Sequence, residues 1–130
     1  MTAELVALVI AAFIHFLHIG VSGAIMNATP EGKAWNMSPR DTPRDMGVLG
    51  GRAQRAEDNN RAALLLFATA ILTLAVSDQF TAWTSALAWL YVVARLLYIP
   101  AYVRGWSPYR SIVWMAGFLA TALLLLAALF

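Results

Sequence analysis

The sequence predicts an all-α integral membrane protein, a four-transmembrane-helix bundle formed by a single domain over residues 1–130. The chain is 61% hydrophobic, and its mean hydropathy of +0.68 is high for a soluble domain. Four apolar runs are each long enough to cross a bilayer, which takes about 20 apolar residues in a helix. The nine Lys and Arg residues are confined to positions 33–61 and 95–110.

The apolar runs are expected to form spans over residues 4–26, 52–76, 80–103 and 110–130. No Lys or Arg precedes the first run and no clear small-residue cleavage site follows it, so we expect a retained helix rather than a signal peptide. Residues 27–51 form the only long irregular connection, because their Pro and Gly residues favour turns. Connections of this length are often binding loops or lids, and this one would cover the cytoplasmic mouth of the bundle.

Charge placement predicts the orientation of the chain. Lys33, Arg40 and Arg44 lie in the first connection and Arg104 and Arg110 in the third, whereas the second connection and the amino terminus carry no basic residue. By the positive-inside rule, the two basic connections face the cytoplasm and both termini lie outside. The net charge is only +2, so the basic pI does not indicate a nucleic-acid partner.

Residue types limit the chemistry further. The chain has no cysteine, so any thiol chemistry must use a thiol that a substrate brings. His15 and His18 share one face of the first helix at the i,i+3 spacing, which could suit a metal. Because no further His accompanies them in the spans, we expect hydrogen bonds to other helices and predict no metal site.

The start of the second span carries polar residues on one helical face. At 3.6 residues per turn, Arg52, Arg55 and Asn59 fall on the same face as Ala62 and Leu66. A membrane helix that carries cations on one face is expected to turn them toward protein or a wet cavity, because lipid cannot solvate them. This face is therefore a candidate binding surface.

A second polar set lies nearby. Glu57 and Arg61 are spaced i,i+4 on the opposite face, with the acid first, which is the favoured order for an exposed pair. Asp58 follows Arg55 by three residues and is a candidate local partner for it. Arg55 therefore has both a local and a ligand-binding explanation.

The third span ends with Tyr91, Arg95, Tyr98 and Tyr102 within a narrow arc of the helix. Arg95 lies eight positions before Val103, roughly 12 Å below the helix end at 1.5 Å per residue. A cation at that depth must face protein or a wet cavity. The tyrosines alternatively form an interfacial belt, and Arg95 alternatively pairs with an acid or with backbone carbonyls.

Arg104 and Arg110 flank the turn before the last span. Either side chain could extend to the lipid headgroups, as juxtamembrane arginines commonly do. Arg110 is the stronger candidate for a site, because Pro108 and the start of the last helix fix its position.

Together these elements resemble the MAPEG family, the membrane-associated proteins in eicosanoid and glutathione metabolism. The matching stretches are Arg52-Ala-Gln-Arg-Ala-Glu-Asp-Asn59, Ala94-Arg-Leu-Leu-Tyr98-Ile-Pro-Ala-Tyr102 and Arg110-Ser-Ile-Val-Trp114. Their order and their placement on four spans are similar to the bacterial branch of the family.

The resemblance implies a homotrimer in a bacterial inner membrane, with glutathione sites between neighbouring subunits that open toward the cytoplasm. It implies a glutathione-dependent transferase or lipid-hydroperoxide peroxidase that takes glutathione as co-substrate and a hydrophobic small molecule from the membrane lipids. Arginine suits the two carboxylates of glutathione and lowers the cost of forming its thiolate. The residues implied to hold the tripeptide are Arg52, Arg55, Asn59, Arg95, Tyr98 and Tyr102, with Arg110, or Arg104 as its substitute, stabilising the thiolate.

One position departs from the family pattern. Ala62 stands where members usually carry Glu, which is expected to meet the amino group of glutathione, and losing such a charged hydrogen bond costs about 1.5–3 kcal/mol. Asp58, one turn earlier, could partly compensate. The alternative function is a non-enzymatic membrane protein whose pocket binds a lipid headgroup or other small anion. A channel fits poorly, because the outer halves of the spans offer no polar path.

Overall fold

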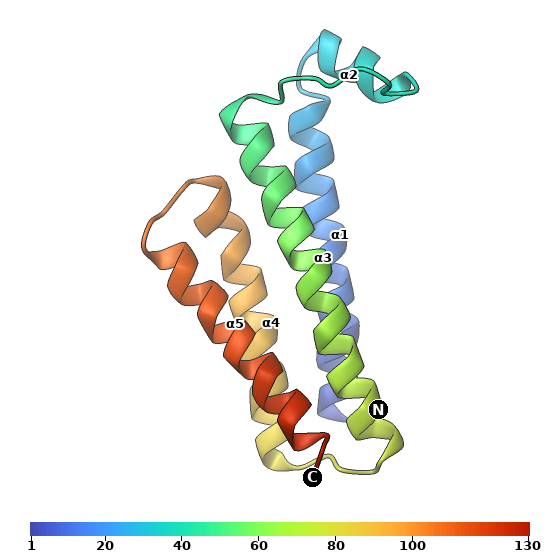
Figure 1. Ribbon diagram of the computed structural model, residues 1–130, viewed down its shortest axis with the longest axis vertical. Coiled ribbons are helices and arrows are strands. Elements are labelled where there is room, and N and C mark those ends of the chain that lie inside the picture. Colours follow the sequence, from blue (N-terminus) through green and yellow to red (C-terminus); the bar gives the residue numbers. More distant parts are fainter.

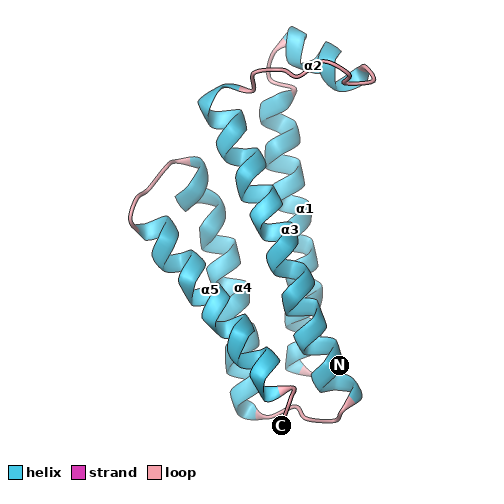
Figure 2. Cartoon of the chain, in the orientation of Figure 1, coloured by secondary structure: helices cyan, strands magenta, loops and turns pink.

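The computed structural model describes residues 1–130 as five α-helices without a strand (Figures 1 and 2). In chain order they are α1 (Ala3–Met26), α2 (Pro30–Met37), α3 (Gly47–Val76), α4 (Ala82–Val103) and α5 (Tyr109–Ala127). All except α2 are long and apolar enough to cross a membrane. The predicted fold class, an all-α bundle with four membrane-spanning helices, is confirmed.

The helices α3 and α4 form the centre of the bundle. They pack against each other, and each also packs against α1 and α5. Toward the end that carries α2, the α4–α5 pair leans away from the α1–α3 pair, and both termini lie at the opposite end (Figure 1). All of the arginines on α3, α4 and α5 lie in the halves of these helices that are nearer the α2 end.

The apolar core lies in the half of the bundle nearer the termini. Phe67 and Leu74 from α3 are fully buried, and Phe67 stacks on the ring of Tyr91 from α4 with 3.9 Å between centroids. Small residues fill much of the rest and let the helix backbones approach closely, as is usual between membrane helices. These are Ala7, Ala11, Ala70, Ala88 and Ala120.

A buried carboxylate joins α1 to α4 at the terminal end. Thr84 Oγ1 donates to Glu4 Oε1 at 2.8 Å, and both side chains are almost fully buried. Thr84 is also half of a capping box with Thr81 that begins α4. Reciprocal caps of this kind satisfy backbone donors that the first helical turn leaves free. This contact fixes the start of two spans relative to each other.

The predicted irregular stretch 27–51 contains ordered helix, so that part of the interpretation is wrong. Thr29 caps α2 by accepting from Gly32 N, and Pro30 occupies the first helical turn, where its missing N–H is tolerated. The helix α3 then starts at Gly47, earlier than the expected residue 52. The sequence contained the signal, because a threonine cap followed by Pro and Glu is typical of a helix start.

Candidate functional site

Arg95 is the centre of the candidate site. Its side chain is only 3% exposed, and Nη1 donates to Asn59 Oδ1 of α3 at 3.0 Å. The rings of Tyr91 and Tyr98 flank the guanidinium, with centroids 5.3 Å and 5.6 Å from its carbon. Its Nε has no hydrogen-bond partner. Both ion pairs in the chain belong to Arg61, so no carboxylate of this chain neutralises Arg95.

The helix α5 leaves room for the guanidinium at Gly117. A Cβ placed on this glycine would lie 3.3 Å from Arg95 Nε and 3.5 Å from Nη2. That spacing is tighter than side chains normally adopt, so a larger residue here would displace the arginine. The close approach of α5 at Gly117 therefore encloses Arg95 from a second helix besides α3.

Above Arg95, toward the α2 end, a second group of aromatic and basic side chains follows. The rings of Tyr98 and Tyr102 are 5.3 Å apart, and the guanidinium carbon of Arg110 lies 5.2 Å from the centre of the Tyr102 ring. These contacts hold Arg110 over the end of α4 through a cation–π interaction. They border a cavity of about 290 Å³ that is lined by Asn59, Tyr98, Tyr102, Arg110, Ser111 and Trp114.

An apolar slot continues from this cavity between α3 and α5. It has a volume of about 310 Å³, with Asn59, Arg95 and Thr121 as its polar lining. The two cavities share Asn59 and Trp114, so a ligand could extend from one to the other. Each is near the lower end of the range of about 300–1,000 Å³ for small-molecule sites. The other residues that line the slot are Ala62, Ala63, Leu66, Phe118, Ala122 and Leu125.

The structure brings five of the eight predicted site residues together. These are Asn59, Arg95, Tyr98, Tyr102 and Arg110, which line the two cavities.

The other three predicted residues lie apart from this group. The guanidinium of Arg52 fills the space beside Gly105 in the α4–α5 turn. A Cβ added to Gly105, whose φ is +70°, would lie 2.8 Å from Arg52 Cζ. Arg104 lies over the ring of Trp106 at 5.3 Å. Arg55 lies against its own helix at Gly51. None of these three lines the two cavities.

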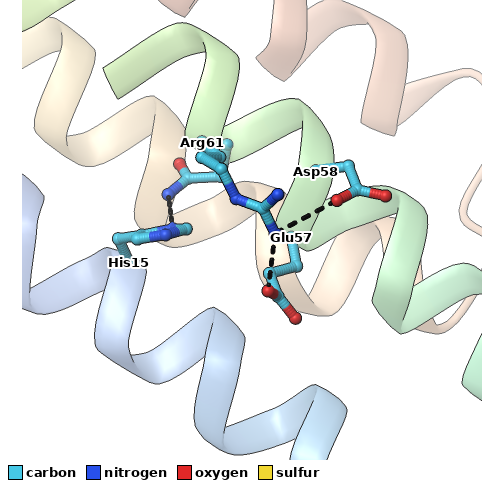
Figure 3. Close-up of polar contacts among 5 residues, drawn as sticks. His15, Glu57, Asp58 and Arg61 are labelled. Atoms are coloured by element: carbon cyan, nitrogen blue, oxygen red, sulfur yellow. Dashed lines mark hydrogen bonds and ion pairs between the residues drawn. The ribbon is translucent and has the colours of Figure 1, made fainter. Parts of the chain in front are cut away.

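The opposite face of α3 carries charges that are already partnered. Arg61 Nη2 lies 3.0 Å from Glu57 Oε1 and 3.2 Å from Asp58 Oδ1 (Figure 3). The expected Glu57–Arg61 pair is thus confirmed. Asp58 was a candidate partner for Arg55, and this was wrong, because Asp58 pairs with Arg61, three residues further along α3. Asp58 lines neither of the two cavities.

A larger cavity of about 570 Å³ lies on this face, under α2. Besides Arg61 and its two acids, it is lined by Arg40 and Arg44. Arg44 Nη2 donates to Thr29 Oγ1 at 3.1 Å, and Arg40 bonds to Asn36. Its cations therefore have partners within the chain, unlike Arg95.

Three residues were missed by the sequence analysis, and two of them belong to the site. Thr121 lines the slot, and Gly117 encloses Arg95. Both lie on the helical face that also carries Arg110 and Trp114, because the four positions follow the spacing i, i+4, i+7, i+11. Asn60 was also missed. Its Nδ2 lies 3.2 Å from His15 Nδ1, which confirms the interhelical hydrogen bond expected of His15. The same expectation for His18 was wrong, because its buried Nε2 has no hydrogen-bond partner.

The fold and the site place this chain in the class of integral membrane four-helix bundles. Its site has a buried arginine without a carboxylate partner beside a small cavity lined by aromatic residues. The chain belongs to the MAPEG family, because the model of that family matches residues 3–130. It is therefore a membrane protein of the glutathione and eicosanoid metabolism family. No curated protein and no solved structure matches the chain.

Proposed function

We propose that this protein is a membrane-bound glutathione-dependent transferase or lipid-hydroperoxide peroxidase that acts on hydrophobic electrophiles. The observation that carries the proposal is Arg95, a buried cation that has no acid of its own chain beside it. A buried charge without a counterion is costly in a low-dielectric site. An anionic ligand that supplies the counterion would remove that cost.

The carboxylates of glutathione fit this requirement. Arginine binds a carboxylate through two parallel hydrogen bonds, and the free Nε of Arg95 offers one of the donors. Asn59, Tyr98 and Tyr102 would hold the rest of the tripeptide from the walls of the smaller cavity. Arg52 and Arg55 would act at its entrance, by adding positive charge that attracts the anionic tripeptide.

Arg110 would stabilise the thiolate. A nearby guanidinium lowers the cost of ionising a thiol, and the ionised sulfur is the nucleophile. In the transferase reaction the sulfur forms a bond to the electrophilic carbon, and the leaving group departs with its electron pair. In the peroxidase reaction, two thiols are oxidised to one disulfide while the hydroperoxide is reduced to an alcohol and water. Arg104 is the second candidate for this role.

The electrophile would enter from the bilayer. The slot between α3 and α5 has an apolar lining and lies within membrane-spanning segments, so a hydrophobic substrate partitioned into lipid could reach the sulfur from that side. We further propose a homotrimer in a bacterial inner membrane, in which each subunit is one four-helix domain and both termini lie outside.

Thiolate formation gives the direct test. Glutathione is added to the purified protein in detergent, the ultraviolet absorbance of the thiolate is recorded, and conjugation to a hydrophobic nitro-activated aryl chloride is then followed. We expect thiolate and product in the wild type, loss of both in Arg110→Ala, and little change in the matched variant Arg104→Ala. Wild-type protein that binds no glutathione would contradict the proposal.

The second candidate is a non-enzymatic membrane protein that binds a small anion such as a lipid headgroup. It is favoured by one observation, because no carboxylate lines either cavity to receive the amino group of glutathione. Binding of an anionic phospholipid that requires Arg95, in a protein without thiolate formation, would support this function instead.

A further inference from the structure

A groove of about 490 Å³ lies between the end of α4 and the start of α5. The turn that joins these two helices is at the α2 end of the bundle (Figure 1). The groove shares no lining residue with the two cavities beside Arg95, so the proposed function gives it no role. Its lining includes Leu97, Pro100 and Ala101 from α4, Trp106 from the turn, and Tyr109 and Val113 from α5.

The way in which α4 ends brings Trp106 to this groove. Gly105 has a φ of +70°, a left-handed conformation that glycine adopts without strain. Gly105 N donates to Tyr102 O at 3.0 Å, and Trp106 N donates to Ala101 O at 2.8 Å. This pair of bonds is a common way to end a helix. The second bond folds the chain back over α4, and both of its residues line the groove.

The turn end of the groove is positively charged. Arg104 is exposed, and its guanidinium carbon lies 5.3 Å from the centre of the Trp106 ring, which forms part of the groove wall. Residues 104–110 contain two arginines and no acidic residue. The charge of the turn is therefore complementary to an anionic group at this end of the groove.

The residue types indicate that the groove begins at the level of the lipid headgroups. Trp106 and Tyr109 are exposed, and tryptophan and tyrosine are common where a membrane helix meets the headgroups. Leu97 lies seven residues before Arg104, roughly 10 Å along the helix at 1.5 Å per residue. The groove thus runs from a cationic turn into the apolar part of the span.

We infer that this groove binds one anionic phospholipid from the surrounding bilayer. The lipid phosphate would lie at Arg104, and an acyl chain would lie along Leu97 and Val113. Basic pockets between membrane helices bind anionic headgroups, and burial of acyl carbons against the apolar wall adds to the affinity. A small free anion would gain only the first of these contributions. The inference is independent of which ligand binds at Arg95.

Quenching of tryptophan fluorescence tests the inference on the full chain in phosphatidylcholine vesicles. The vesicles contain a minor fraction of phosphatidylglycerol or of phosphatidylcholine with bromine on an acyl chain, because bromine quenches only indole rings in close contact with it. The chain has five tryptophans, so the contribution of Trp106 is the difference between a protein and its Trp106→Phe form. We expect phosphatidylglycerol to associate with Trp106 about fivefold more strongly than phosphatidylcholine, the value of one arginine near an anionic lipid.

Three variants locate the binding site. Arg104→Gln should abolish the preference for phosphatidylglycerol. Lys33→Gln is the matched control, because it removes an exposed cation from the other basic connection, and it should keep the wild-type preference. Val113→Phe narrows the groove while Arg104 stays in place, and it should lower the preference.

Several results would overturn the inference. Equal quenching by the two lipids in the wild type would show that the groove does not select an anionic lipid. A preference that persists in Arg104→Gln or Val113→Phe would place the lipid outside the groove, and one that falls equally in Lys33→Gln would reflect only the general surface charge. If neither lipid quenches Trp106, a second copy of the chain covers the groove instead.

Discussion

The two faces of α3 use charge in opposite ways. On one face, Arg61 is 61% exposed at its side chain and contacts two carboxylates. On the other face, Asn59 meets Arg95, which is almost fully buried and has no carboxylate at all. The exposed cation therefore has two counterions, whereas the buried cation, for which a counterion matters more, has none.

This difference indicates what each face does. Exposed pairs such as Glu57–Arg61 contribute little to stability, typically below about 1 kcal/mol, and need no function to explain them. A buried cation without an acid is expensive to maintain, and such residues in membrane helices usually mark a binding site. The same contrast separates the cavity under α2 from the two cavities beside Arg95. The cations that line the cavity under α2 have partners within the chain, whereas Arg95 has no carboxylate partner.

The largest effect is expected from Arg95→Met. It removes the charge that binds the ligand carboxylate, and we expect glutathione affinity to fall by about one to two decades, the value of a charged hydrogen bond. The matched variant Arg61→Met should bind as the wild type does, as measured by calorimetric titration. Equal losses of glutathione affinity in the two variants would show that the two faces of α3 do not differ in ligand binding.

A smaller effect is expected from Asn59→Asp, which gives the buried arginine the acid that the other face already has. The new carboxylate competes with the ligand carboxylate, and we expect about a tenfold loss of glutathione affinity. Asn59→Ala removes only the hydrogen bond and should weaken binding less, by about fivefold. Unchanged binding in Asn59→Asp would mean that the ligand does not contact Arg95.

A modest effect is expected from Gly117→Ala. The added methyl would lie 3.3 Å from Arg95 Nε, so the guanidinium must shift by a few tenths of an ångström. We expect a few-fold loss of affinity with little change in thermal stability. Gly20→Ala is the control, since no atom lies within 4 Å of its added Cβ. A Gly117→Ala protein that binds like the control would place the ligand away from Nε.

The smallest effect is expected from the double variant Glu57→Gln, Asp58→Asn. It removes both partners of Arg61, and the free energy of unfolding should change by less than about 1 kcal/mol, because the pairs are largely exposed. Ligand affinity should stay at the wild-type value. A clear loss of binding would show that this acidic face reaches a site, for example that of a neighbouring subunit.

The sequence was sufficient to predict the fold class. Hydropathy alone located four spans, because membrane helices must satisfy all backbone groups internally and therefore need long apolar runs. The helix α2 was missed because Pro and Gly between residues 27 and 51 dominated the interpretation. The cap formed by Thr29 and Pro30 is a local signal that composition obscures.

The sequence also placed the central site residues on their correct helix faces. Periodicity brought Tyr91, Arg95 and Tyr98 onto one arc, and the structure shows both rings flanking the guanidinium. The sequence could not show which arginine would pair with Asp58. Arg55 and Arg61 each stand three residues from Asp58, and only side-chain packing distinguishes them.

Contacts between helices could not be predicted from the sequence. The approach of Gly117 to Arg95 and the bond between Asn60 and His15 depend on how α5 packs on α4 and α1 on α3. Helical periodicity gives the face of each residue, but it does not give the rotation of one helix against another.

Thermal unfolding of ligand-free Arg95→Met beside the wild type tests the central claim most directly, which is that the protein does not neutralise Arg95 by itself. If the claim holds, the variant unfolds at about the same temperature as the wild type, because no longer burying an unpaired charge offsets the loss of the hydrogen bond to Asn59 and of the contacts with the Tyr91 and Tyr98 rings. A fall of several degrees would contradict the claim, since Arg95 would then already have a counterion within the folded protein or its assembly.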